Sequence, residues 1–153
     1  MPCNGRQPAL SADGEKLALL IKAAQTVHAA LEVEMRQRLG ISGSHYDVLR
    51  ALADAPGGYL RMVDIADRMC ISRSGVTQSV DRLEELGLVE RVANREDRRL
   101  VLAEITARGC ELIPVGCEVI EAVAARFITE TLSERQAAAL ASALAKVAVP
   151  RGQ

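Results

Sequence analysis

The sequence predicts a mainly α-helical protein that carries one small β-hairpin. Apolar residues recur at steps of three and four through most of the chain, which is the period of helices with one buried face. Two short stretches, Leu88 to Val92 and Leu100 to Ile105, lack that period and flank a polar, charged segment, as the strands of a hairpin do. Serine, threonine, glycine and proline stand between these stretches, where helices begin and end.

The composition is that of one folded unit with its own core. The chain has 153 residues, of which 49% are apolar and 25% charged, and its net charge is −1. It has no run of eighteen apolar residues, and its N-terminal segment lacks the basic start and apolar core of a secretory signal. We therefore expect a cytoplasmic protein that does not enter a membrane.

The first 69 residues predict a tail and three helices. Residues 1–12 are polar and contain prolines, so a flexible tail is expected. From Asp13, apolar residues at helical spacing predict a long helix that Gly40 ends. Ser44, with Asp47 three residues later, predicts the start of a second helix, which the Ala-Pro-Gly-Gly segment at 55–58 ends. A short extended piece at 59–61 and a third helix at 62–69 follow.

A helix-turn-helix followed by the hairpin is predicted in the middle of the chain. Ser72 caps a fourth helix, which a turn of about three residues separates from the third, and its inward stripe is Val76, Val80 and Leu83. Gly87 ends this helix, and the hairpin tip at 93–99 is polar and charged. This order of elements defines a winged helix, so residues 43–105 are predicted to be a winged helix-turn-helix DNA-binding domain.

Two further helices are predicted after the hairpin. Thr106 caps a helix that runs towards Thr129 and that Pro114 should kink or divide, and Ser133 with Gln136 opens a last helix through Val147. Because both ends of the chain carry long apolar stripes, residues 13–42 and 106–149 are predicted to form a helical dimerisation region. The predicted interface residues are Leu17, Leu20, Ile21, Val119, Val123, Phe127, Leu140 and Leu144.

The chain resembles the MarR (multiple antibiotic resistance regulator) family over residues 15–148. The resemblance rests on ISRSGVTQSVDRLEELGLVER, on EDRR running into LVLAEIT, and on ARG after Thr106. It implies a homodimer on a palindromic operator, and repression that a small phenolic or other anionic or lipophilic ligand, or thiol oxidation, relieves. Two departures concern the wing: Asn94-Arg95 stands where the family often has Asp-Pro, and Glu104 where many members have a basic or neutral residue.

Two groups of residues are predicted to contact double-stranded DNA. On the fourth helix, Gln78 suits adenine, and Thr77 offers a methyl to thymine or a hydroxyl to phosphate. The predicted contacts on this helix are Arg73, Ser74, Thr77, Gln78 and Arg82. On the wing, the resemblance implies that Asp97 orients Arg99 into the minor groove, with Arg95 and Arg98 on phosphates. A solvated helix face and a surface ion pair are the alternatives.

The charge pattern agrees with this prediction only locally. Between Arg91 and Arg99, four arginines stand against Glu96 and Asp97, a local excess of two positive charges. A second function class, a winged helix whose arginines dock an acidic protein, therefore stays open. The small polar face of the fourth helix argues against it, because protein interfaces favour aromatic and Met anchors.

The possible effector and metal sites are less defined. His28, His45, Tyr46 and Arg50 lie on the first two helices and are the predicted pocket for an anionic aromatic effector, with core or surface roles as the alternative. The two histidines are apart from any cysteine and carboxylate cluster, so neither a metal nor another cofactor is expected. No nucleophile and base pair or glycine-rich phosphate loop suggests an enzyme.

The cysteines leave open thiol oxidation as an alternative trigger for release from DNA. They are Cys3, Cys70, Cys110 and Cys117, and they form no CxxC pair. Free cysteine is usually a small buried apolar residue, which is the expected role for Cys70, Cys110 and Cys117. A thiol-based redox regulator of the same fold is the alternative, and a disulfide between the two copies of a dimer also stays open.

Overall fold

The computed structural model describes residues 9–94 and 100–148, and within them the protein is mostly helical with one small sheet. This confirms the predicted fold class. The elements, in chain order, are α1 (Ala12–Leu39), α2 (Gly43–Ala53), a 3₁₀ turn η1 (Pro56–Gly58), β1 (Tyr59–Arg61), α3 (Met62–Met69), α4 (Arg73–Glu85), β2 (Val89–Ala93), β3 (Val101–Ile105), α5 (Ala107–Ala124), a π-helical turn η2 (Ala125–Thr129) and α6 (Glu134–Val147).

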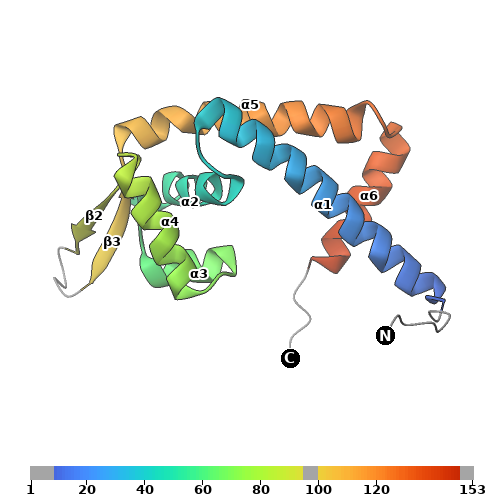
Figure 1. Cartoon of the computed structure of the whole chain (residues 1–153), viewed down its shortest axis with the longest axis horizontal. Coiled ribbons are helices and arrows are strands. Elements are labelled where there is room, and N and C mark those ends of the chain that lie inside the picture. Colours follow the sequence, from blue (N-terminus) through green and yellow to red (C-terminus); the bar gives the residue numbers. More distant parts are fainter. Residues whose placement is uncertain (1–8, 95–99, 149–153) are drawn as a thin grey trace, which may run out of the picture.

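The elements form two parts that α1 and α5 join (Figure 1). At one end of the molecule lie α2, α3, α4 and the strands, which together make the winged helix. The C-terminal half of α1 packs on α5, and the N-terminal half of α1 leaves that contact and borders a groove together with α6. None of the helices in the described ranges is long and apolar enough to cross a membrane.

The sheet has three antiparallel strands in the order β1-β3-β2. The predicted hairpin supplies β2 and β3, and the short extended piece pairs with β3 on its other side. Tyr59 of β1, Glu104 of β3 and Glu90 of β2 stand in one row across the sheet. Leu60, Ala103 and Arg91 form the next row. Because successive side chains alternate between faces, Leu60, Ala103 and Arg91 point to the face opposite Tyr59, Glu104 and Glu90.

The core lies where α1, α2, α3, α4, α5 and the sheet meet. Met35, Leu49, Ile65 and Leu83 are among its fully buried side chains. Val119 and Val123, predicted to contact a second copy, are only 1% and 5% exposed in the single chain. That prediction is wrong for these two residues, because α5 uses this face to pack within its own protomer.

The capping residues agree with the sequence at three helix starts and one helix end, and they differ at two helix starts. Ser72, Thr106 and Ser133 cap α4, α5 and α6, and the Ser133–Gln136 capping box is present. Gly87 follows α4 with φ 69°, and the amide of Leu88 donates to the carbonyl of Leu83 (2.9 Å), as in a Schellman ending.

The two differences concern α1 and α2. Ser11 caps α1, so the helix begins at Ala12 and the predicted tail is too long at its C-terminal end; residues 1–8 lie outside the described part. Ser42, not Ser44, caps α2, and its Oγ accepts from the amide of His45 (3.2 Å). Glu32 of α1 accepts from the amide of Gly43 (2.7 Å), and this contact between helices, invisible in a local pattern, fixes the earlier start.

Pro114 does not divide α5. The helix is continuous from Ala107 to Ala124, although proline cannot supply the amide that its fourth preceding carbonyl would accept. Pro114 is exposed, as is Cys110, whose carbonyl is the one affected, so water can reach that group. The prediction of a divided helix is therefore wrong.

Candidate nucleic-acid interface

Helix α4 separates a buried stripe from an exposed polar face. Val76, Val80 and Leu83 are all 0% exposed and hold the helix against the core. All five residues predicted to contact DNA lie on its exposed side, namely Arg73, Ser74, Thr77, Gln78 and Arg82. The structure thus brings them together on one surface, while their contacts with DNA stay a prediction.

Local hydrogen bonds define what some of these side chains offer. The Thr77 hydroxyl donates to the carbonyl of Arg73 (3.0 Å), one turn back, so the donor of Thr77 is already used. The Ser74 and Ser72 hydroxyls are 3.0 Å apart, and Ser72 also accepts from the amide of Gly75 (3.2 Å). Arg82 pairs with Glu85 at 2.9 Å on the exposed surface, a contact that a phosphate can replace at little cost.

The strand β2 carries an arginine whose role the sequence did not indicate. Arg91 donates from Nη2 to Asp81 Oδ1 (2.5 Å) and from Nη1 to Glu84 Oε2. Its backbone amide donates to Glu84 Oε1 (3.2 Å). Arg91 therefore does not belong to the cationic hairpin tip, which corrects the charge count made from the sequence.

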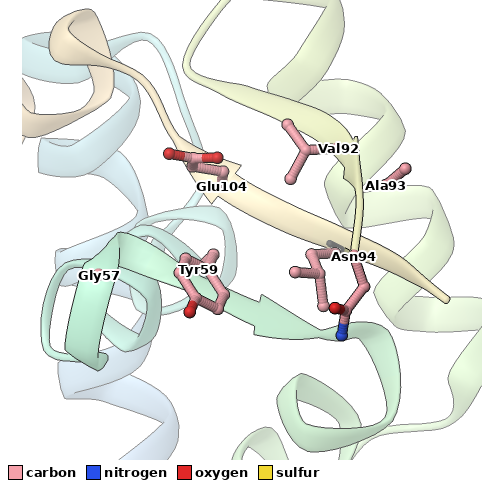
Figure 2. A pocket seen from close by; sticks show the side chains of 7 residues that line it. Gly57, Tyr59, Val92, Ala93, Asn94 and Glu104 are labelled. Carbon is pink, nitrogen blue, oxygen red and sulfur yellow. The ribbon is translucent and has the colours of Figure 1, made fainter. Parts of the chain in front are cut away.

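The predicted wing contacts Arg95, Asp97, Arg98 and Arg99 lie outside the described residues. The strands that lead to them are described, and a hollow of about 600 Å³ opens on the sheet face turned away from α4 (Figure 2). Tyr59, Asn94 and Glu104 are among its lining residues. Glu104 stands directly opposite Glu90, so this outer face is acidic and unsuited to phosphates.

The residues predicted as an effector pocket do not form one group. Tyr46 is 1% exposed, its hydroxyl donates to the carbonyl of Ile113 (2.8 Å), and its ring lies where a Cβ on Gly116 would come within 2.0 Å. Burial and the hydrogen bond with Cys117 raise the pKa of Tyr46. Tyr46 is thus a core residue that joins α2 to α5, which corrects its place in the predicted pocket.

The remaining three pocket residues lie around the α1–α2 junction. His28 and Arg50 are exposed, and both act electrostatically on Asp47, whose pKa burial raises. His45 is half-buried, and its pKa is lowered by burial and then by Arg36 and Arg82. Glu32, Arg36 and Asp47 therefore share this polar junction, although nothing in their local sequence pattern marks them.

The terminal helices enclose an apolar groove of about 650 Å³. The residues that line it come from α1, η2 and α6 and include Leu20, Phe127, Leu140 and Leu144, four of the predicted interface residues. Leu17 and Ile21, two more of that set, are exposed on α1. The sequence indicated the apolar character of these residues, but not that they border one groove.

The cysteines differ from the expectation. Cys70, Cys110 and Cys117 are free and exposed, so the prediction that they are buried is wrong, while Cys3 lies outside the described residues. Cys70 ends α3 in the left-handed region (φ 52°), where the turn into α4 begins. Cys117 Sγ lies 3.4 Å from the Tyr46 hydroxyl. In the described part of the chain, no group of His, Cys, Asp and Glu residues could hold a metal ion.

Comparison with known proteins gives a consistent result. A model of the MarR family matches residues 39–100. The HTH-type transcriptional repressor MdtR of Bacillus subtilis (strain 168) is 33% identical over 119 residues, which cover 76% of this chain and 75% of MdtR. The HTH-type transcriptional regulator FarR of Neisseria gonorrhoeae is 34% identical over 109 residues, covering 71% of this chain and 72% of FarR.

The similarity extends to solved structures. Sco3205, a MarR family transcriptional regulator from Streptomyces coelicolor crystallised in complex with DNA, matches with a TM-score of 0.80 and 26% identity, over 92% of this chain and 89% of Sco3205. These relatives are transcriptional regulators and not enzymes. The exposed polar face of α4 and the adjoining hairpin are thus the parts of a known DNA-binding architecture. The chain belongs to the MarR family of DNA-binding transcriptional regulators.

Proposed function

We propose that this protein is a homodimeric repressor that binds an inverted-repeat operator and is released by a small anionic or lipophilic effector. The observation that carries the proposal is the division of α4 into a fully buried apolar stripe and an exposed polar face beside the hairpin. The similarity to the repressor MdtR supports the direction of regulation. Such a regulator acts in the cytoplasm, on the chromosome.

The exposed face of α4 enters the major groove of the operator. Gln78 reads adenine, Thr77 presents its methyl to thymine because its hydroxyl is bonded to Arg73, and Ser74 contacts a base edge or phosphate. Arg73 and Arg82 contact bases or phosphates. In the wing, Asp97 orients Arg99 into the adjacent minor groove, and Arg95 and Arg98 bind phosphates.

The apolar surface of the terminal helices supports a second copy as the partner. Leu17, Leu19, Ile21 and Val147 are exposed, and no residue of α6 is buried in the single chain. An amphipathic helix without a buried face is covered by a partner in a stable protein. A two-fold dimer also places two α4 helices on one side of the duplex, about 34 Å apart, as an inverted repeat requires.

Fluorescence anisotropy with duplexes selected from genomic fragments tests the DNA-binding proposal. If the dimer neutralises about eight phosphates, the slope of log affinity against log salt is near −7. Binding to an inverted repeat with this slope, and loss of affinity when one half-site is scrambled, is the expected result. Affinity that depends neither on salt nor on the half-sites would contradict the proposal.

The proposed effector binds at the polar junction between α1 and α2, where His28, His45 and Arg50 lie. Tyr46 is not part of this proposed effector site, because its side chain is buried in the core. Calorimetry with benzoate as the probe tests this site, with Arg50→Gln as the variant that removes an exposed cation. Binding that is unchanged in the variant would show that an effector of this class uses another site.

Thiol oxidation is the second candidate for the signal that releases the protein from its operator. The observation in its favour is that Cys117 is exposed and lies 3.4 Å from the hydroxyl of the core residue Tyr46. A larger oxidised sulfur at this position would press on the contact between α2 and α5. Operator release by peroxide in the natural protein, and its absence in Cys117→Ser, is the expected result of this alternative.

A further inference from the structure

The hairpin is attached to α4 at two levels. At its base, the Thr106 hydroxyl donates to the carbonyl of Gly87 (2.8 Å), and Val89 is buried in the core. Two residues further towards the tip, Arg91 binds Asp81 and Glu84. The base of the hairpin is thus joined to the end of α4 and to the core without Arg91, and Arg91 adds a second attachment nearer the tip.

Arg91 forms a fork between the strand and the helix. Its guanidinium contacts one carboxylate with each terminal nitrogen, and its backbone amide donates to the second of these carboxylates. The Arg91 side chain is 27% exposed, against 53% and 40% for Asp81 and Glu84, so the arginine lies beneath the two acids. A planar guanidinium that binds two acceptors in fixed directions fixes the angle between the strand and the helix. A single point charge does not constrain this angle.

The carboxylates belong to the part of α4 that carries the reading residues. Asp81 follows Thr77 by four positions and Gln78 by three, so it lies on the same face of the helix, and Glu84 follows Asp81 by three. The fork therefore ties β2 to the turn of α4 that comes directly after the predicted base contacts. A change in the angle between the hairpin and this turn would therefore strain or break the contacts of Arg91 with Asp81 and Glu84.

We propose that Arg91 is a positioning residue for operator recognition: it fixes the β2–β3 hairpin at the angle to α4 at which both elements engage their grooves together. The inference rests on the proposed operator binding. Arg91 itself does not contact DNA, because its guanidinium is committed to the two carboxylates of α4. Its effect falls on specific binding, which needs both grooves, and not on general attraction to phosphates.

The Arg91→Lys variant tests the proposal, because it keeps the charge and removes the fork. We expect the operator affinity to fall about tenfold, the size of one lost base-reading contact, and the affinity for unrelated duplex to stay within about twofold. The thermal midpoint should stay close to that of the natural protein. Arg38→Lys is the matched control, because Arg38 pairs with Glu118 (2.8 Å) between α1 and α5, away from the reading face, and its operator affinity should not change.

A neutral triple variant, Asp81→Asn, Glu84→Gln and Arg91→Met, separates positioning from charge. It leaves no unpaired carboxylate on α4, yet it also lacks the fork, so we expect operator affinity to remain about tenfold low. Recovery of the natural affinity would overturn the proposal and assign Arg91 only a neutralising role. Unchanged specific affinity in Arg91→Lys would also overturn it. Failure of the natural protein to prefer any operator would instead refute the proposed function.

Discussion

The winged helix and the terminal helices cover their apolar side chains in different ways. In the winged helix, the inward residues of α4 are fully buried, and α2 places Val48, Leu49 and Leu52 in the same core. In the terminal helices, Leu17 is 57% and Leu19 67% exposed, and α6 buries none of its residues. The first part therefore covers its apolar side chains within one chain, whereas the second leaves many of them exposed, as the proposed dimer would require. The four predictions below test this division, from the largest effect to the smallest.

Leu83→Ala should give the largest loss, because it opens a cavity in the winged helix. A fully buried leucine replaced by alanine costs about 3–4 kcal/mol of unfolding free energy. Urea denaturation followed by circular dichroism measures it. Leu17→Ala is the control, measured at protein concentrations at which the proposed dimer has dissociated: the same truncation at a site exposed in the protomer should leave its unfolding nearly unchanged. Equal losses in the two variants would contradict the proposed division.

Leu144→Asp should act on assembly instead of on the protomer. Leu144 borders the apolar groove and is partly exposed, so a carboxylate there is tolerated in a single chain but not beneath a second copy. We expect the dimer dissociation constant to rise at least about a hundredfold, equivalent to about 2.7 kcal/mol. Sedimentation over a concentration series measures it, and a dimer that persists at natural affinity would show that this groove lies outside the interface.

Tyr46→Phe should have a moderate effect, because it removes one hydrogen bond between α2 and α5 and leaves the Ile113 carbonyl without that donor. The expected cost is about 1 kcal/mol. Tyr59→Phe removes a hydroxyl from a tyrosine that is about half exposed and should cost far less. Thermal unfolding of both variants makes the comparison. A Tyr46→Phe protein as stable as Tyr59→Phe would mean that this bond does not couple the helices.

The pH dependence of His45 should give the smallest effect. Its pKa in the folded protein lies below the ordinary value of 6.5, because of burial and of Arg36 and Arg82, while Glu32 opposes the shift. The unfolded chain therefore binds more protons, and stability falls as the pH drops through and below 6.5. Because His45 is half-exposed, screening limits the loss to a few tenths of a kcal/mol.

His45→Gln should remove this component of the pH dependence between pH 7.5 and 5.5. Asp47 contributes with the opposite sign, because its pKa is raised, but over a lower pH range near its ordinary value of 3.8. Urea midpoints at the two pH values, in the natural protein and in the variant, measure the difference. Identical slopes in both proteins would show that His45 does not contribute.

Features that depend on residues close together in the sequence could be predicted, and features that depend on residues far apart in the sequence could not. The caps at Ser72, Thr106 and Ser133 and the glycine ending at Gly87 depend on residues three or four positions away, and all were predictable. The inward stripe of α4 follows from helical periodicity alone. The fold class follows from these local features together.

The features that could not be predicted depend on distant partners. Tyr46 is in the core because Ile113 and Gly116, 67 and 70 positions further along the chain, provide an acceptor and the space for its ring. Val119 was assigned to a partner chain because periodicity shows that a face is apolar, but not which protein covers it. Likewise, Arg91 could be counted as a charge, while its engagement with Asp81 and Glu84 required the packing of β2 against α4.

Helix α1 belongs to both parts of the molecule. Its residue Met35 is in the core, while its first half borders the apolar groove. With 28 residues, the helix is about 42 Å long, and it acts as a lever. A rotation of about 10° at one end would displace the other end by about 7 Å, close to two base-pair steps of duplex DNA. In the proposed dimer, a small change in the contacts between the two copies would therefore be enough to shift the reading helices relative to the operator.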